Sequence, residues 1–302
     1  MDDTPLLREL EPTVSELLER HLATAKEWFP HQLVPWGRGR DYSPDEAWDP
    51  GEYPVSDGVR SALFVNLLTE DNLPYYFNQI DRVFGDGAWG EWNRRWTAEE
   101  HRHSIVIRDY LTVTRALDPV ALERARMRQV AGGETPQPES VEDGIVYVTL
   151  QELATRVAHR NTGKLLEDRA GYEVMARVAA DENLHHLFYR DLASAALLVE
   201  PSAMVIAIER QLRTFEMPGT GIPDFSSHAA AIAKEGIYDY AAHHDAILVP
   251  VVLRHWRIEE LEGLTSDAAR ARDRVLDHIR RVGIAGRRVM ARRERVLAES
   301  AS

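Results

Sequence analysis

The chain has 302 residues and no cysteine, which excludes disulfides, zinc-thiolate sites and iron-sulfur clusters. Hydrophobic residues make up 44% of it, enough for a large core, and no apolar run approaches the roughly 18 residues that a membrane-spanning helix needs. The net charge of −13 argues against nucleic acid as a partner, and the acidic start lacks a signal-peptide core, so we expect a cytoplasmic protein without a membrane span.

Hydrophobic periodicity and the placement of proline and glycine predict helices along most of the chain. A first helix is expected at 11–28, followed by a loop-rich stretch to about residue 56. Further helices are expected at 57–83, 89–116, 120–130, 142–168 and 172–200, with flanking helices at 202–216, 226–243, 246–261 and 266–296. We interpret residues 1–302 as one all-α domain, with an N-terminal part (1–56), a bundle core (57–200) and flanking C-terminal helices (201–302).

One proline is predicted to distort the second of these helices. Pro74 lies four residues after Glu70 and has no N–H to donate to the Glu70 carbonyl. We therefore expect a kink at Glu70.

One acidic and histidine pattern occurs twice. A glutamate is followed thirty residues later by Glu-x-x-His, and the two copies are 82 residues apart. Of the 12 histidines, only the two in this pattern have a glutamate three residues upstream. The six residues are Glu70, Glu100 and His103 in the first copy and Glu152, Glu182 and His185 in the second.

The spacing within each copy suits a metal site. Residues three apart project from one face of a helix, so a Glu and a His at this spacing can hold one ion. A thirty-residue interval suits a helical hairpin, and two packed hairpins would bring four carboxylates and two imidazoles together. Four carboxylates balance the charge of two divalent ions. Solvated glutamates and core histidines are the alternative, which the repetition disfavours. The set is typical of di-iron or di-manganese sites in ferritin-like four-helix bundles with a long crossover.

The C-terminal segment is strongly basic. Between Arg270 and Arg295 there are ten arginines and three acidic residues, so this segment carries +7 and the rest of the chain −20. It is either a solvated basic helix or a docking face for an acidic protein.

Several stretches together carry a resemblance to a known family. The chain resembles the soluble acyl-[acyl-carrier-protein] desaturases, which include the plant stearoyl desaturase and actinobacterial relatives. The similar stretches are T-E-D-N-L-P-Y-Y from Thr69, W-T-A-E-E-H-R-H from Trp96, G-I-V-Y-V-T-L-Q-E-L-A-T from Gly144, A-H-R-N-T from Ala158, A-A-D-E-N-L-H from Ala179 and R-H-W-R-I-E-E-L-E-G-L-T from Arg254.

The resemblance implies roles for particular residues. The four glutamates and two histidines of the repeated pattern would bind two iron ions, with Glu100 and Glu152 as bridging candidates. Further roles are implied for Thr155 at the oxygen-activation site, for His159, Asp181 and Trp36 in bringing electrons to the cluster, and for Gly144 and Ile145 in lining the acyl channel. Without the family, Thr155 could equally be a helix threonine that bonds its own backbone.

The chain departs from the family pattern at three positions. Leu184 stands where the family commonly has arginine, so a charge partner of the cluster carboxylates is expected to be missing. Asp143 precedes Gly144 where an apolar residue is frequent, and Gln79 replaces an expected apolar lining. These departures bear on the length of the acyl chain that is accepted and on the position of the double bond more than on metal binding.

The resemblance implies an O2-dependent di-iron enzyme that inserts a double bond into a saturated acyl chain on acyl carrier protein. It also implies electrons from a ferredoxin-type donor and a homodimer. The alternatives are a di-iron oxygenase acting on a specialised acyl or amino substrate, a ferritin-like iron-handling protein, and a catalytically silent acyl-binding homologue.

Overall fold

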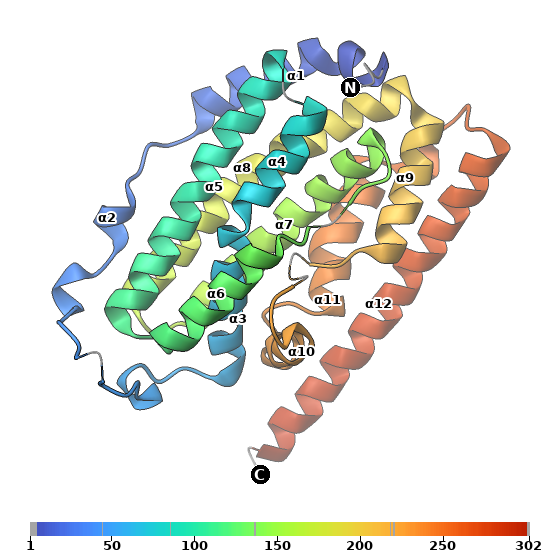
Figure 1. Ribbon diagram of the computed structural model, residues 1–302. Coiled ribbons are helices and arrows are strands. Elements are labelled where there is room, and N and C mark those ends of the chain that lie inside the picture. Colours follow the sequence, from blue (N-terminus) through green and yellow to red (C-terminus); the bar gives the residue numbers. More distant parts are fainter. Residues whose placement is uncertain are drawn as a thin grey trace.

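The computed structural model describes residues 5–43, 45–84, 86–135, 137–217, 219 and 221–300. This part of the chain is built of helices and contains no strand. Figure 1 shows long helices lying side by side, with the C-terminal helix along one flank. None of the helices in these residues is both long and apolar enough to cross a bilayer. The expectation of an all-α fold is confirmed.

Four helices form the bundle that carries the repeated pattern: α3 (Asp57–Asp71), α5 (Gly87–Thr114), α7 (Val141–Leu165) and α8 (Arg169–Val199). Within it α7 packs against α8 and α3, while α5 packs against α3 and α8. The core between them holds large buried side chains such as Leu63, Ile107, Leu150 and Phe188. Each bundle helix therefore presents one face to the same interior.

Local sequence signals set the starts of these helices. Ser56 and Ser140 each accept a hydrogen bond from a backbone N–H in the first turn of α3 and α7, and Asp168 does so for α8. Such side chains satisfy N–H groups that have no partner within the helix. The cap at Ser140 fixes the start of α7 eleven residues before Gln151, which lines the cavity described below.

The helix expected at 57–83 is broken in two. α3 ends at Asp71, and α4 (Leu73–Phe84) begins after Asn72, whose backbone N–H donates to the carbonyls of Thr69 and Glu70. Pro74 lies in the first turn of α4, where proline is tolerated. The distortion expected at Glu70 is confirmed, as a break two residues further on.

The long crossover between the two hairpins contains α6 (Pro119–Gly132), which begins after the N-cap Asp118. Gly133 ends it with a φ of +65°. A Cβ at Gly133 would lie 2.5 Å from the Tyr75 ring, so both the backbone conformation and the space require glycine. α6 is thereby held against the α3–α4 side of the bundle, where Tyr75 donates a hydrogen bond to the Val130 carbonyl.

The remaining helices cover the bundle. α1 (Pro5–Thr24) packs on α5 and α8, α9 (Pro201–Thr214) on α7 and α8, and α10 (Phe225–Glu235) on α3. The basic helix α12 (Ser266–Ser300) packs on α9. Shorter elements complete the described chain: α2 (Pro30–Leu33), α11 (Tyr240–Ala242) and 3-10 turns at Trp36–Arg38, Pro50–Glu52 and Ile258–Glu260.

Three expected helices were wrong in their bounds. The helix expected at 226–243 is divided into α10, which ends at Glu235, and α11. The first helix begins at Pro5 and ends at Thr24, so Trp28 lies beyond it in a connecting segment. The segment expected as one helix at 246–261 is a π-helix from His243 to His255, with Pro250 inside it. The wider π-helical turn places Ile247, Leu248, Val251 and Val252 in the core. Because the spacing of these residues is also typical of an α-helix, hydrophobic periodicity predicts an ordinary helix here.

Candidate metal centre

The structure brings the repeated pattern together as two overlapping groups of potential metal ligands. One group is Glu70, Glu100, His103 and Glu182; the other is Glu100, Glu152, Glu182 and His185. Within each group the donor atoms lie within 4.8 Å of one another. All six residues are buried.

Each bundle helix contributes to this centre. Glu70 comes from α3 and Glu152 from α7, while α5 and α8 each supply a Glu-x-x-His pair. Glu100 and Glu182 belong to both groups, whereas Glu152 belongs to one. The two groups therefore share Glu100 and Glu182, whereas the expected bridging candidates were Glu100 and Glu152. Which carboxylates would bridge two ions stays a prediction.

The side chains fit a pair of metal ions. His185 Nδ1 lies 2.7 Å from Glu100 Oε1 and 3.5 Å from Glu152 Oε2, yet these three buried atoms make no hydrogen bond within the described residues. His103 Nδ1 lies 3.5 Å from both Glu100 and Glu182, again without a hydrogen bond. Unpaired buried donors and acceptors that converge in this way require an explanation, and metal coordination supplies one.

Within the protein alone, the pKa values of several residues of the cluster are strongly shifted. Burial would lower the pKa of His103 and His185, but the facing carboxylates raise both well above the ordinary value. Burial, and then the charge of Glu182, raise the pKa of Glu152 well above its usual range. Burial also acts to raise the pKa of Glu182, but the facing His103 and His185 hold it well below normal. Divalent ions would replace the protons of the groups whose pKa is raised.

A carboxylate outside the cluster contacts the other ring nitrogen of each histidine. Asp181 Oδ2 lies 3.5 Å from His103 Nε2, and Glu99 Oε2 lies 3.0 Å from His185 Nε2. Each carboxylate is the residue immediately before a shared glutamate. This arrangement orients the imidazole and directs Nδ1 to the metal side.

Both outer carboxylates have further partners. The Trp28 indole N–H donates to Asp181 at 2.8 Å, and His21 Nε2 lies 2.9 Å from Glu99 Oε2. Burial would raise the pKa of Glu99, but hydrogen bonds from His185 and His21 lower it well below the ordinary value. Glu99 is therefore a carboxylate at neutral pH.

Arginines pair with both outer carboxylates. Arg102 lies 3.2 Å from Asp181 and 3.7 Å from Glu99, so one guanidinium serves both sides. Arg177 also pairs with Asp181, and Arg95 with Glu99. The expectation at Leu184 concerned a charge partner of the ligand carboxylates themselves, and it stays a prediction.

Trp36 lies away from the centre. Its side chain is 50% exposed, and its indole N–H donates to the His31 carbonyl. The tryptophan connected to Asp181 is Trp28, which is buried and stacks 6.5 Å from the His103 ring. Trp28, which the sequence placed at the end of a helix, is thus the tryptophan that contacts Asp181, and the role implied for Trp36 stays a prediction.

His159 and Thr155 lie on the α7 face of the centre. His159 Nε2 is 3.1 Å from Glu70 Oε1 and 3.7 Å from Glu182 Oε1, so it touches two ligand carboxylates directly. The Thr155 hydroxyl donates to the carbonyls of Gln151 and Glu152, as a helix threonine can, and its side chain also lines the adjoining cavity. Its position is thus compatible with both expectations, a role beside the centre and a helix threonine bonded to its own backbone.

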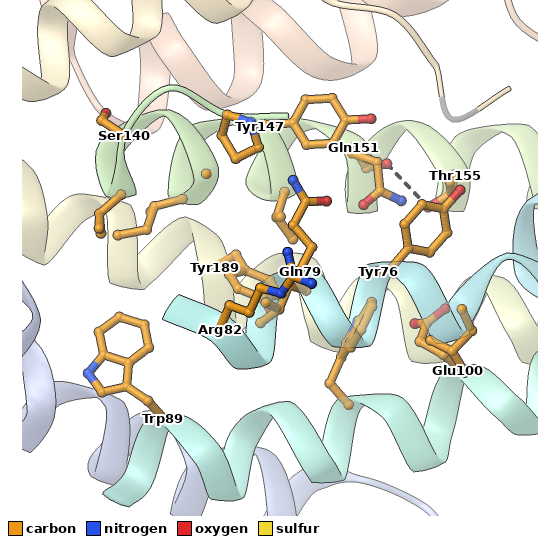
Figure 2. Close-up of a pocket in the computed structure, with 18 of the residues that line it drawn as sticks. Tyr76, Gln79, Arg82, Trp89, Glu100, Ser140, Tyr147, Gln151, Thr155 and Tyr189 are labelled. Atoms are coloured by element: carbon orange, nitrogen blue, oxygen red, sulfur yellow. Dashed lines mark hydrogen bonds between the residues drawn. The ribbon is translucent and has the colours of Figure 1, made fainter. Parts of the chain in front are cut away.

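A cavity of about 360 Å³ runs from the centre between α4, α5, α7 and α8 (Figure 2). It is lined by Glu70, Glu100, Glu182 and Thr155 of the centre and also by Arg82, Glu139 and Ser140. Figure 2 shows Glu100 and Thr155 at one end and Ser140 at the other. Its apolar wall includes Leu73, Ile80, Trp89, Trp96, Ile145 and Val148. Gly144 and Ile145 lie in the wall, as the resemblance implied, and so does Gln79.

Asp143 does not line this cavity. It is fully buried and accepts hydrogen bonds from Arg210 at 2.6 and 3.0 Å and from Gln211 at 3.0 Å. It therefore ties α9 to the start of α7 and does not contribute to the cavity wall.

Sequence motifs do not identify five further residues around the centre: Glu99, His21, Trp28, Arg102 and Arg177. A signal for Glu99 was present, because an acidic residue precedes the Glu of each Glu-x-x-His pair, as Glu99 and as Asp181. His21 and Trp28 come from segments outside the bundle, and no spacing within the chain relates them to the ligands.

Comparisons with known proteins agree with this geometry. The family model described as fatty acid desaturase matches residues 2–301. The acyl-[acyl-carrier-protein] desaturase named DesA1 of Mycobacterium tuberculosis is 45% identical over 284 residues, which cover 90% of this chain and 84% of that protein. The chloroplastic stearoyl-[acyl-carrier-protein] 9-desaturase 6 of Arabidopsis thaliana is 33% identical over 239 residues, covering 73% and 61%.

A solved structure shares the fold. The X-ray structure of the acyl-ACP desaturase DesA2 from Mycobacterium tuberculosis H37Rv superposes with a TM-score of 0.71 at 28% identity, covering 86% of this chain and 97% of that one. The buried centre, the adjoining cavity, the family match over nearly the whole chain and these relatives lead to one conclusion. The chain belongs to the fatty acid desaturase family, among the acyl-[acyl-carrier-protein] desaturases.

Proposed function

We propose that this protein is an O2-dependent di-iron desaturase that inserts a double bond into an acyl chain carried on acyl carrier protein. In the balanced reaction two neighbouring methylene groups lose two hydrogen atoms. O2, two protons and two electrons from a ferredoxin-type donor complete it, and two water molecules are formed. The acyl carrier is inferred from the names of the relatives.

One observation carries this proposal: the buried ligand centre opens directly onto an elongated, largely apolar cavity. Glu70, Glu100 and Glu182 belong to the ligand groups and also line the cavity. An alkyl chain lying there would pass beside the centre with its methylene groups shielded from water. Ligand pockets of this size are usually apolar with a few placed polar groups.

Two bound irons would supply the oxidising power that no amino-acid side chain has. The residues of the chain supply position and environment. Asp181 and Glu99 orient the two histidines, and the Trp96 indole N–H donates to Glu152 Oε1 at 3.1 Å, which orients that carboxylate. Leu73, Ile80 and Ile145 exclude water from the alkyl chain.

Electron delivery is proposed to follow the path Trp28, Asp181 and His103. The indole of Trp28 is hydrogen-bonded to Asp181, which contacts the ring of His103. Arg102 lies 4.8 Å over the Trp28 ring and is partly exposed, so the path reaches toward the surface. His159 contacts two ligand carboxylates and is proposed to modulate their electrostatic environment.

The test is product analysis by mass spectrometry. Iron-loaded protein is incubated with ferredoxin, reductase, O2 and a series of saturated acyl carrier protein thioesters. A product lighter by two hydrogen atoms is expected, and fragmentation would locate the double bond. A product heavier by one oxygen atom would show an oxygenase instead. Iron uptake far beyond two ions per chain without an organic product would show an iron-handling protein.

A further inference from the structure

A hollow of about 450 Å³ lies between α7, α8 and the π-helix from His243 to His255. Basic side chains from all three elements line it: Arg156 on α7, His186 and Arg190 on α8, and Arg254 and His255 on the π-helix. None of the lining residues in the described part of the chain is acidic, although the whole chain carries −13. Positive charge is therefore concentrated here against the composition of the chain.

Two of the three arginines lack a counter-ion. Within the described residues, no carboxylate forms an ion pair with the guanidinium of Arg156 or Arg254. Arg156 is only partly exposed, and burial, followed by the charge of Arg160, lowers its pKa. An arginine stays charged under such conditions, so the cost of placing it here is not relieved by loss of its proton. An anion in the hollow would relieve this cost.

The charge that remains suits a dianion. Arg190 Nε donates to Asp191 at 2.8 Å, and Asp191 also pairs with Arg20 at 2.7 Å, so this carboxylate is already shared outside the hollow. Three arginines and one aspartate leave +2. A phosphate monoester carries about −1.5 to −2 at pH 7, and its oxygens accept paired hydrogen bonds from the fork of a guanidinium group.

The packing around the hollow holds these groups in place. Pro250 and Arg254 line it four residues apart on the π-helix, a rare element that is frequent at functional sites. The Trp256 indole N–H donates to the Arg190 carbonyl at 3.2 Å, which joins the end of the π-helix to α8. Arg190 and Arg254 are thus presented by elements that are fixed to each other.

The hollow has an apolar wall as well. Leu153, Leu187, Pro250 and Val251 line it beside the arginines. Its volume lies within the range of about 300–1,000 Å³ that is typical of small-molecule sites, and one water occupies only about 30 Å³. A bare phosphate would leave much of this space and the apolar wall uncovered, whereas an organic group attached to the phosphate would cover them.

We propose that this hollow binds a phosphate monoester, with the phosphate group at Arg156 and Arg254 and the organic group on the apolar wall. None of the residues that line the hollow belongs to the ligand groups of the metal centre or lines the acyl cavity. The site is therefore additional to the proposed desaturase site and does not depend on it.

Calorimetric titration of the iron-loaded protein at constant ionic strength tests the inference. The probes are phenyl phosphate, inorganic phosphate and malonate, which separate a monoester, a free phosphate and a dicarboxylate. Phenyl phosphate is expected to bind once per chain and about tenfold more tightly than the other two, because burial of about 60 Å² of its apolar surface corresponds to a tenfold gain in affinity.

Arg156→Gln and Arg254→Gln should each weaken the binding of phenyl phosphate about tenfold or more, because each removes a hydrogen bond between charged groups. Arg254→Lys keeps the charge without the fork and should recover only part of the loss. Arg160→Gln is the matched control, since Arg160 is an exposed arginine of α7 that does not line the hollow, and it should bind like the unaltered protein. Phenyl phosphate should raise the Tm of the unaltered protein and of Arg160→Gln, which also confirms folding.

The absence of saturable phenyl phosphate binding by the unaltered protein would overturn the inference. An equal loss in Arg160→Gln would also do so, because it would show diffuse electrostatic attraction. Equal affinities for phenyl phosphate and inorganic phosphate would overturn the organic part of the ligand, and tighter binding of malonate would overturn the phosphate. Weaker binding of acyl carrier protein by Arg156→Gln and Arg254→Gln, with phenyl phosphate binding unchanged, would assign these arginines to a protein partner instead.

Discussion

Asp181 Oδ2 lies 3.5 Å from His103 Nε2, on the side of the imidazole ring that faces away from the ligand cluster. Glu99 stands in the same relation to His185, at 3.0 Å. The two-fold repetition seen in the potential ligands therefore extends to the carboxylates that support them. Each histidine is held by the acidic residue that precedes the shared glutamate of the opposite Glu-x-x-His pair.

This arrangement predicts that the two supports act on different ions. Asp181→Asn should weaken iron binding in the group that contains His103, and Glu99→Gln in the group that contains His185. Loss of such a partner typically costs about tenfold to 100-fold in metal affinity. Iron titration followed by Mössbauer spectroscopy, which separates inequivalent irons, measures each effect.

Asp191→Asn serves as the matched control, because Asp191 lies on α8 but pairs with Arg20 and Arg190 rather than with the centre. It should bind iron like the unaltered protein. An equal loss at both irons in each of the two variants would contradict the assignment of one support to one ion.

A second prediction concerns the shared ligands. Glu182→Gln removes a carboxylate that belongs to both groups, so the variant should lose both ions, whereas Glu152→Gln should retain the ion held beside His103. Iron per folded chain, measured by elemental analysis with circular dichroism to confirm folding, distinguishes the two results. If Glu152→Gln lost both ions and Glu182→Gln kept one, Glu152 would be the bridging residue after all.

The clustering of the six glutamates and histidines was predictable from the sequence because they follow a local rule, Glu-x-x-His on one helix face, that occurs twice at the same spacing. The helix break just after Glu70 was predictable for a similar reason, since Pro74 acts on its own turn. His21 and Trp28 obey no such rule. They reach the outer carboxylates only because α1 and the segment after it pack on α5 and α8.

Tertiary packing also explains the other differences. Arg102 from α5 reaches Asp181 on α8, a contact that no single motif encodes. Asp143 stands where the family frequently has an apolar residue, and Arg210 on α9 holds it outside the cavity. The π-helix from His243 to His255 escaped prediction because its apolar residues also fit the ordinary helical spacing.

The position of Trp28 predicts a specific kinetic defect. Trp28→Phe keeps an aromatic ring but removes the N–H that donates to Asp181. Stopped-flow reduction of the loaded protein by its electron donor should slow, while iron content stays at two ions. Trp36→Phe is the matched control, because Trp36 is half exposed and bonds only the His31 carbonyl. A slowed reduction in Trp36→Phe alone would place the path at Trp36.

The charge state of the empty cluster predicts opposite pH dependences for the iron-free and the loaded protein. The pKa values of His103 and His185 are raised in the folded state. The stability that they contribute is therefore fully present below the ordinary histidine pKa of about 6.5 and is lost as pH rises through the raised values. Iron binds the deprotonated groups, so iron affinity should increase as pH rises.

Urea unfolding of iron-free protein across the pH range measures the first dependence, and calorimetric iron titration in buffers of different ionisation enthalpy measures proton release. Iron-free protein that becomes more stable as pH rises from 7 would contradict the raised histidine pKa values. Iron binding without proton release would do so independently.

The contact between Asp143 and Arg210 predicts how a departure from the family pattern can be tolerated. Asp143→Leu leaves the Arg210 guanidinium, which is about one-third exposed, without its buried partner and should lower the free energy of unfolding by about 2 kcal/mol. Adding Arg210→Leu should restore at least about half of this loss, because an apolar pair can replace a buried ion pair. Urea unfolding of the two single variants and the double variant at equal iron content completes the cycle. Since Asp143 does not line the cavity, the position of the double bond in the product should be unchanged in all three. A shifted double bond in Asp143→Leu would return Asp143 to the acyl channel, and additive losses would show that the two side chains do not interact.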